Sequence, residues 1–311
     1  MDGIINIDKP IGKTSFAVVA AIRRLAGERR VGHGGTLDPM ASGVLPVCIG
    51  RGTRVVEFLA EARKTYAAEI TLGVTTDTYD TEGRITQRGD PFGIERETIV
   101  EALKSFQGRV EQRPPMYSAV KHNGRRLYEL ARMGVTVERP LRPANIYRIE
   151  LLNYASPLLT LEVECGKGTY IRSIADDLGR ALGCGAHLTG LVRTAYGPFR
   201  IEDAVSLDGF EAAYREGQWQ ELVQPLDIAL ETWPAVTVSD EQGHFIVNGR
   251  PLSLDEDGLP QEAETGGRLC AYSHEGCLLA VLKFRAESGQ WHPAKVFNRR
   301  QADAVSEILD S

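Results

Sequence analysis

The sequence predicts an α+β protein with a mixed, largely antiparallel sheet flanked by helices, followed by a small C-terminal all-β domain. Segments with strand-like alternation are interleaved with segments of helical periodicity, without the regular strand–helix–strand order of a doubly wound fold. Near residue 230 the pattern changes to short strand-like runs separated by glycine-rich or acidic turns. We therefore expect a large domain at residues 1–231 and a small one at residues 232–311.

Each element follows from its local pattern. Residues 3–10 are an apolar run closed by a proline, which predicts a strand and a turn. Residues 14–28 predict a helix capped by Thr14 or Ser15, because apolar side chains recur every three or four positions. The same rules predict helices at residues 53–62, 95–106 and 168–183, and strands at residues 65–73, 158–165, 236–242, 250–254, 267–273 and 277–284.

The composition is that of an ordinary soluble protein, with 42% apolar and 25% charged residues. The sequence does not start with basic residues followed by an apolar run, so we expect no leader. No stretch approaches the roughly 20 apolar residues that cross a bilayer. We therefore expect a cytoplasmic protein that does not bind a membrane. The five cysteines are scattered without a CxxC pair, and the six histidines without an HxxxH pair. This spacing argues against disulfides and predicts no metal site.

Charge is divided unevenly along the chain. Residues 1–200 hold 28 Lys and Arg against 22 Asp and Glu, whereas residues 201–311 hold 8 against 20. Residues 109–148 alone carry nine basic and three acidic side chains. Such a local excess can attract a polyanion, although a solvated surface stretch would have the same composition.

Two short motifs resemble known ligand loops but have the wrong spacing. Gly12-Lys13-Thr14 could end a phosphate-binding loop, but the position that needs the first glycine is Ile7. The segment DTYDTEG, residues 77–83, does not place its acids at alternate positions as a calcium loop does. We expect both segments to form turns at the surface.

The segment RVGHGGTLDPMASGVLP, Arg30 to Pro46, holds one carboxylate, Asp38, among four glycines. Glycines allow unusual backbone conformations and leave room for a bulky ligand to approach the main chain. A carboxylate held rigidly there could act as a nucleophile or a base. An aspartate before Pro39 is also common in simple turns, so the local sequence leaves both interpretations open.

Residues 113–134 combine basic and aromatic side chains, among them Lys121, Arg125, Arg126, Tyr128 and Arg132. Basic groups contact phosphates and aromatic rings stack on unpaired bases, so the mixture fits looped or single-stranded RNA better than a duplex. An ordinary cationic hairpin and helix is the alternative.

Tyr170 and Arg172 lie two positions apart where a strand gives way to a helix. If a turn begins at Gly168, both side chains can reach one pocket. In the alternative arrangement Arg172 pairs with Asp176, one helical turn further on.

In this order, the stretches resemble the TruB-type tRNA pseudouridine synthases. The resemblance spans roughly residues 3–200, and its GGTLDPMASGVLP block is highly specific. The chain length and the IGRGTR continuation are more similar to the stand-alone bacterial form than to the guide-RNA-dependent enzymes. The matching pieces are INIDKPIGKTS, VGHGGTLDPMASGVLPVCIGRGTR, KTYAAEITLG, TDTYDTEG, PPMYSAVKHNGRRLYELAR, CGKGTYIRSIADDLG and HLTGLVRTAYGPF.

The resemblance implies a cofactor-free isomerase that converts uridine 55 in the T loop of tRNA to pseudouridine. It also implies a monomer that needs no protein partner, an RNA-gripping insertion at about residues 109–148 and a PUA-like RNA-binding domain at residues 232–311. The functional residues of the family fall on the catalytic Asp38, the base-stacking Tyr66, the active-site Tyr170, the ion-pair partner Arg172, the pocket residue Leu191 and the nucleotide-extruding His33.

Two other functions remain as alternatives. The chain could be a tRNA-binding chaperone that acts independently of catalysis, although such a protein would not need the Asp38, Tyr66 and Arg172 set. A metal-dependent hydrolase acting through Asp38 would need a second carboxylate or a histidine at ligand spacing, and the nearby sequence offers neither.

Overall fold

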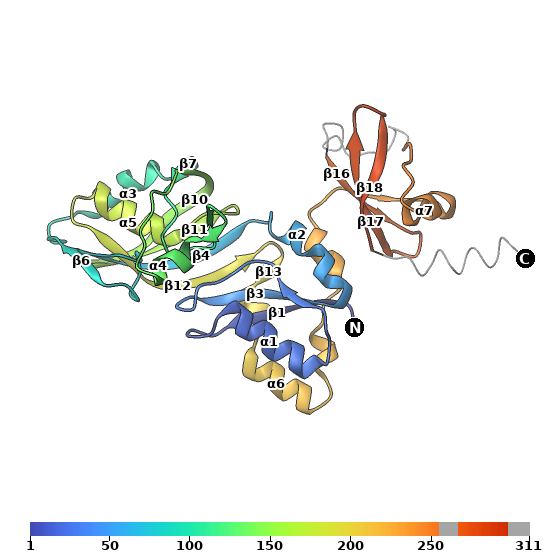
Figure 1. Cartoon of the computed structure of the whole chain (residues 1–311), viewed down its shortest axis with the longest axis horizontal. Coiled ribbons are helices and arrows are strands. Elements are labelled where there is room, and N and C mark those ends of the chain that lie inside the picture. Colours follow the sequence, from blue (N-terminus) through green and yellow to red (C-terminus); the bar gives the residue numbers. More distant parts are fainter. Residues whose placement is uncertain (255–266, 298–311) are drawn as a thin grey trace, which may run out of the picture.

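The computed structural model describes residues 1–254 and 267–297, which form a large central sheet and a separate C-terminal sheet (Figure 1). The main path of the central sheet runs β14-β1-β3-β12-β4-β11-β10-β7, with β2 paired to β3 and β13 to β12. Its strands are β1 (Gly3–Lys9), β2 (Val31–His33), β3 (Ser42–Ile49), β4 (Lys64–Leu72), β7 (Gly108–Gln112), β10 (Arg142–Ala155), β11 (Leu158–Cys165), β12 (Ala186–Tyr196), β13 (Phe199–Arg200) and β14 (Val205–Ser206).

The pairing confirms the predicted mixed, largely antiparallel sheet. Only the β1–β14 and β3–β12 pairs are parallel among the described strands of this sheet. Two small hairpins lie outside it, β5 (Val74–Thr76) with β6 (Ile85–Arg88), and β8 (Lys121–His122) with β9 (Arg125–Arg126).

Helices cover the sheet at two places (Figure 1). Near β1 and β3, α1 and α6 bury the apolar side chains that β1 and β3 direct toward them. Toward the other end, α3 and α5 pack on β4, β10, β11 and β12. The helices are α1 (Ser15–Ala26), α2 (Val56–Leu59), α3 (Arg96–Lys104), α4 (Leu127–Arg132), α5 (Ile171–Ala181), α6 (Leu207–Arg215) and α7 (Asp240–Val247). Among the described residues, no helix is both long and apolar enough to span a membrane.

The first helix shows how local sequence sets these bounds. Thr14 is its N-cap, with a side chain that accepts a hydrogen bond from the Ala17 amide at 3.0 Å. The helix ends at Gly27, whose left-handed φ of 64° suits a residue without a Cβ atom. Val18 and Ile22 are fully buried on one face. The predicted helix and one of its two predicted caps are therefore confirmed.

Two central segments differ from the expectation. The helix expected at residues 53–62 is instead a 3₁₀ turn, η1 (Gly50–Val55), followed by the four-residue α2. The Thr53 hydroxyl donates to the Gly50 carbonyl at 2.7 Å, which stabilises the tighter turn. Residues 42–49, considered above only as part of the glycine-rich segment, form the almost entirely buried strand β3.

The C-terminal sheet has the order β15-β16-β17-β18. It confirms the predicted strands at 267–273 and 277–284, but residues 236–242 form a strand only as far as Thr237. There Ser239 and Gln242 build a capping box that starts α7, so this part is not purely β. Residues 250–254 contribute one bridge, from Leu252 to Trp291. The strands are β15 (Ala235–Thr237), β16 (Arg268–Tyr272), β17 (Leu278–Arg285) and β18 (Gln290–Val296).

An apolar cluster joins this sheet to the central one. Phe58 of α2 packs edge-on against Trp233, with ring centroids 5.3 Å apart, and contacts Phe297 at 6.5 Å. Glu57 and Glu61 of the same region pair with basic side chains of the C-terminal sheet. The two sheets are thus joined by aromatic contacts that are flanked by ion pairs.

Candidate active site

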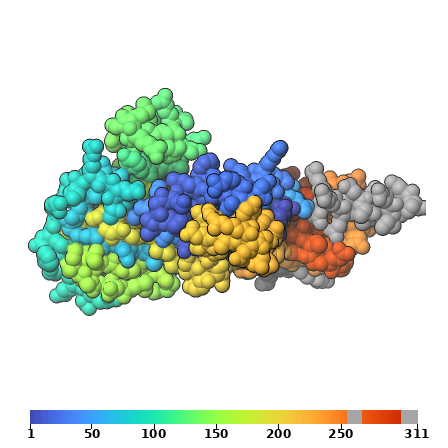
Figure 2. All heavy atoms as spheres, turned by 90° about the horizontal axis from the view of Figure 1, so that it is seen from below, coloured from blue at the N-terminus to red at the C-terminus, as the bar shows by residue number. Residues whose placement is uncertain are grey.

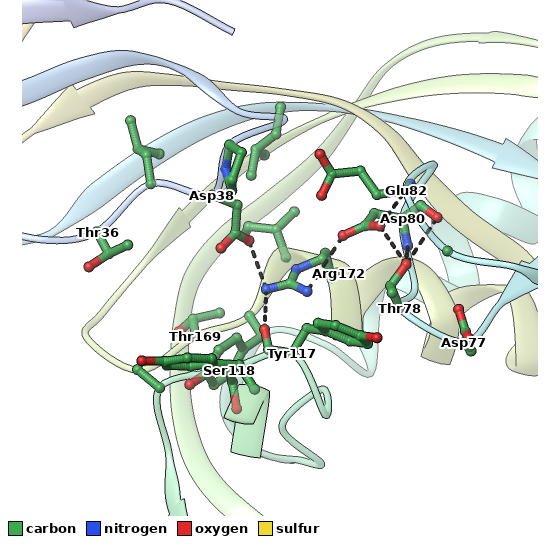
Figure 3. Close-up of a pocket in the computed structure, with 18 of the residues that line it drawn as sticks. Thr36, Asp38, Asp77, Thr78, Asp80, Glu82, Tyr117, Ser118, Thr169 and Arg172 are labelled. Atoms are coloured by element: carbon green, nitrogen blue, oxygen red, sulfur yellow. Dashed lines mark hydrogen bonds and ion pairs between the residues drawn. The ribbon is translucent and has the colours of Figure 1, made fainter. Parts of the chain in front are cut away.

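A pocket of about 700 Å³ opens where the loop before β3, the start of α5 and the segment between β7 and β10 meet (Figure 3). Five of the six residues predicted to act on the substrate line it: Asp38, Tyr66, Tyr170, Arg172 and Leu191. They come from positions far apart in the sequence, and the sheet brings them together.

The centre of the pocket is an ion pair. Arg172 Nη2 lies 2.8 Å from Asp38 Oδ2 and donates to the Tyr117 carbonyl at 2.9 Å. Arg172 Nη1 lies 3.5 Å from Asp80 Oδ2. The guanidinium is therefore held by two carboxylates and a carbonyl, as the dashed lines in Figure 3 show. Its planar fork is suited to several acceptors at once.

Burial differs across this network. The Arg172 side chain is 6% exposed and that of Asp80 4%, whereas that of Asp38 is 36% exposed. Asp38 therefore faces the pocket while its partners are enclosed by protein. The alternative pairing of Arg172 with Asp176 is wrong, because Asp176 binds Arg180 at 2.6 Å.

Sequence reasoning missed Asp80. The DTYDTEG segment was expected to be a surface turn, and it does turn, with Tyr79 at a φ of 67°. However, Asp80 Oδ1 accepts hydrogen bonds inside that turn from the Thr78 hydroxyl at 2.5 Å and the Glu82 amide at 3.1 Å. This leaves Oδ2 directed at Arg172. The available signal was the presence of TDTYDTEG among the family-like stretches.

The loop that carries Asp38 is fastened through its backbone. Gly34 and Gly35 carbonyls accept from the Tyr196 hydroxyl at 2.5 Å and Arg193 Nη2 at 3.2 Å. The Pro39 carbonyl accepts from the Gly12 amide at 2.8 Å and from the Lys9 ammonium at 3.4 Å. Burial lowers the pKa of Lys9 to about 8.

The Gly12-Lys13-Thr14 turn therefore has a structural use. It ends at Ser15, whose hydroxyl donates to the Leu37 carbonyl at 3.1 Å and accepts from the Leu37 amide at 2.9 Å. Both bonds are buried. The residue next to Asp38 is thereby fixed to the first turn of α1.

Ser15→Ala should lower the free energy of unfolding by about 2 kcal/mol, because it leaves a buried amide and a buried carbonyl of Leu37 unpaired. Denaturant unfolding measures the difference. The control is Ser105→Ala, which removes an exposed hydroxyl bonded to the Ala102 carbonyl. Equal losses in the two variants would contradict the role assigned to Ser15.

Contrary to the expectation, most of the glycines around Asp38 do not provide room for a ligand. A Cβ atom on Gly43 would lie 2.3 Å from the Arg193 carbonyl oxygen, and its φ is 101°. One on Gly35 would lie 3.2 Å from the Tyr196 hydroxyl. These glycines let β12 approach the loop, so their space is filled by the protein itself.

Tyr66 and Leu191 form an apolar wall of the pocket. Leu191 pairs with Ala68 across β4 and β12, and Arg193 pairs with Tyr66, so these side chains share one sheet face. Tyr66 is 8% exposed, and burial raises the pKa of its hydroxyl. Burial also raises the pKa of Tyr170. Both phenols therefore stay protonated at neutral pH.

Within the predicted RNA-gripping segment, the β8–β9 hairpin and α4 stand out as a knob from the body of the molecule, shown in green in Figure 2, whereas the two ends of the segment are strands β7 and β10 of the central sheet. Arg126, Tyr128 and Arg132 line the pocket, with the two guanidinium carbons 5.8 and 5.4 Å from the centre of the Tyr128 ring. Lys121 and Arg125 lie on the adjoining β8–β9 hairpin, exposed and outside the pocket lining.

His33 is the one residue predicted to act at the target nucleotide that does not line the pocket. It ends β2, pairs with Val47 of β3, and is not among the residues that line the pocket. Burial lowers the pKa of its imidazole. Within the described residues, no group of three or more His, Cys, Asp or Glu side chains is placed to hold a metal ion.

Comparison with known proteins finds matches along most of the chain. Residues 23–171 match a family model described as TruB family pseudouridylate synthase (N terminal domain), and residues 172–231 match one described as tRNA pseudouridylate synthase B C-terminal domain. The tRNA pseudouridine synthase B of Dehalococcoides mccartyi is 50% identical over 96% of this chain and 98% of its own length. That of Clostridium kluyveri is 46% identical over 83% and 87%.

A solved structure shares the fold. In the crystal structure of a Cbf5–Nop10–Gar1 complex, one chain superposes with a TM-score of 0.75 and 31% identity, covering 96% of this chain and 86% of that one. The Dehalococcoides mccartyi relative and this solved structure each cover 96% of the chain, whereas the two family models end at residue 231, before the C-terminal sheet. The chain belongs to the TruB family of tRNA pseudouridine synthases.

Proposed function

We propose that the protein isomerises uridine 55 in the T loop of tRNA to pseudouridine, with Asp38 as the catalytic carboxylate. The observation that carries the proposal is the Asp38–Arg172 ion pair at 2.8 Å, in which the carboxylate is the more exposed partner and faces a pocket large enough for a nucleotide. The opposite charge of Arg172 attracts the carboxylate and orients it.

The reaction breaks the N1–C1′ bond, turns the uracil and joins C5 to C1′, after which the proton on C5 is released to solvent and N1 takes up a proton. Asp38 can attack C1′ to give a sugar ester that the uracil later displaces through C5. Alternatively, it can remove the C2′ proton to give a glycal and return that proton afterwards. In either route the carboxylate is regenerated, and neither oxidation nor hydrolysis occurs.

The detached uracil must be held while it turns. Tyr66 offers an aromatic face and Leu191 an apolar wall, both from the face of the sheet next to Asp38. This enclosure limits the access of water, which would otherwise capture the sugar and cause base loss. Tyr66 and Tyr170, two of the tyrosines that line the pocket, can serve the uracil for hydrogen bonding or proton transfer.

The uridine must leave its stack to reach this pocket, at a cost of a few kcal/mol. We assign the compensating contacts to the knob, where Arg126 and Arg132 can bind phosphates and Tyr128 can stack on an unpaired base. Lys121 and Arg125 extend the same basic surface. His33 would act earlier, during extrusion of the nucleotide.

Tritium release tests the function and the position together. A tRNA transcript labelled at uridine C5 should lose one equivalent of tritium per tRNA molecule in the presence of catalytic amounts of protein. A transcript with cytidine at position 55, labelled in its uridines, should lose none. Release that is independent of position 55 would contradict the assigned target.

Asp80→Asn should lower kcat about tenfold with little effect on RNA affinity, because Arg172 loses the charge of its second carboxylate partner. The amide keeps an acceptor for Thr78 and Glu82, so the turn is preserved. Single-turnover tritium release gives the rate. Asp77→Asn, an exposed residue that also lines the pocket, is the control. Wild-type turnover by Asp80→Asn would argue against the network.

We also propose that residues 1–231 are the catalytic domain and residues 232–311 a PUA-like RNA-binding domain in a cytoplasmic monomer. Support comes from the separate β15–β18 sheet. Its acidic sequence limits it to a few RNA contacts rather than a broad phosphate surface. Limited proteolysis tests the domain boundary, and a first cleavage well inside residues 1–231 would contradict it. Sedimentation measures the molecular mass and so tests whether the protein is a monomer.

A further inference from the structure

The turn before α1 and the first turn of α1 each expose one large apolar side chain beside the active site. Ile11 is 71% exposed and Phe16 is 70% exposed, with the exposed Lys13 between them. Phe16 does not support the fold, because α1 buries Val18 and Ile22 on its other face. Exposed aromatic side chains gathered with other apolar groups indicate a binding surface rather than packing.

Hydrogen bonds fix this segment to the catalytic loop. Gly12 follows Ile11 and binds the Pro39 carbonyl, and Ser15 precedes Phe16 and binds the Leu37 backbone. Leu37 and Pro39 both line the pocket. The exposed side chains of residues 11–16 therefore form a rim next to Asp38.

The other side of the pocket is the basic and aromatic knob. Figure 3 shows Thr36 and Asp38 across Arg172 from Tyr117 and Ser118, which belong to the segment leading into the knob. An RNA strand that enters the pocket between the two sides would contact Arg126, Tyr128 and Arg132 on one side and residues 11–16 on the other side.

We propose that Ile11, Lys13 and Phe16 form a second RNA-binding wall, which takes the nucleotide next to the flipped uridine. This inference rests on the proposed function. Flipping one base exposes the face of its neighbour, and the Phe16 ring replaces that lost stacking. Lys13 neutralises the adjoining phosphate, and Ile11 packs on the ribose. The positive charge of Lys13 and the continuity with the pocket favour RNA over a protein partner.

Phe16→Ala should raise the KM for a T-arm stem–loop RNA about tenfold and leave kcat within about twofold, because stacking on an aromatic ring contributes affinity and not chemistry. Phe16→Tyr keeps a ring face and should restore the wild-type KM, whereas Phe16→Leu should not. Phe92→Ala is the matched control: Phe92 is 73% exposed and does not line the pocket.

Lys13→Gln should reduce the slope of log Kd against log salt by about one, as expected for the loss of one phosphate contact. An unchanged KM and Kd in Phe16→Ala would overturn the proposal and assign the patch to another partner. The Kd of the stem–loop RNA is measured by fluorescence titration without turnover. A failure of the proposed isomerisation, seen as no tritium release by the wild type, is therefore distinguishable from a failure of this second wall.

Discussion

Asp38→Asn should abolish tritium release while the protein still binds tRNA, with the rate falling by a factor on the order of 10⁴ or more. An amide is neither a nucleophile for C1′ nor a base for the C2′ proton, yet it has the shape of the carboxylate. The Asp38 side chain is 36% exposed, so loss of its ion pair should cost about 1 kcal/mol of stability or less.

Single-turnover tritium release and a binding titration on the same preparation separate chemistry from affinity. Glu82→Gln is the control, because Glu82 also lines the pocket but makes no ion pair with Arg172. Measurable release by Asp38→Asn would remove Asp38 from the proposed mechanism. Loss of RNA binding in the same variant would instead favour a purely structural role for this carboxylate.

After Asp38, substitutions at Arg172 should have the largest effects, here on both the free energy of unfolding and kcat. Arg172→Met should lower the free energy of unfolding by about 3 to 5 kcal/mol, because it leaves Asp80 charged, buried and without its cation. Arg172→Lys keeps the charge but cannot reach Asp38, Asp80 and the Tyr117 carbonyl together, so kcat should fall about 100-fold.

Denaturant unfolding and single-turnover tritium release test these values. The control is Lys104→Met on α3, whose ion pair with Glu101 is 68% and 73% exposed on its two sides and should contribute less than about 1 kcal/mol. A fully stable Arg172→Met variant with wild-type turnover would show that the two carboxylates do not depend on the guanidinium.

The sequence predicted the central fold because periodicity is a local property. Alternation identified β4, and spacing with a capping residue identified α1. The apolar residues at 236–238 predict a strand through residue 242, but the capping box of Ser239 and Gln242 starts α7 within that range. Strand β3 was missed because it is buried on both faces and therefore does not alternate.

The site was less predictable, since it depends on contacts between distant residues. Local chemistry left Asp38 open between a turn and a catalyst, and Arg172 open between a pocket shared with Tyr170 and an ion pair with Asp176. Only the resemblance linked Asp38 with Arg172, 134 positions apart. Asp80 was not predicted, because its role depends on a turn in which one carboxylate oxygen accepts hydrogen bonds and the other is directed at Arg172.

The backbone attachments of the Asp38 loop also bear on heat inactivation. Gly34, Gly35, Leu37 and Pro39 are bound to side chains or amides of β1, β12 and the start of α1, which belong to the main core. A loop held in this way has no low-energy opening of its own. Activity and the folded state should therefore be lost in one cooperative transition, rather than activity declining first at a lower temperature.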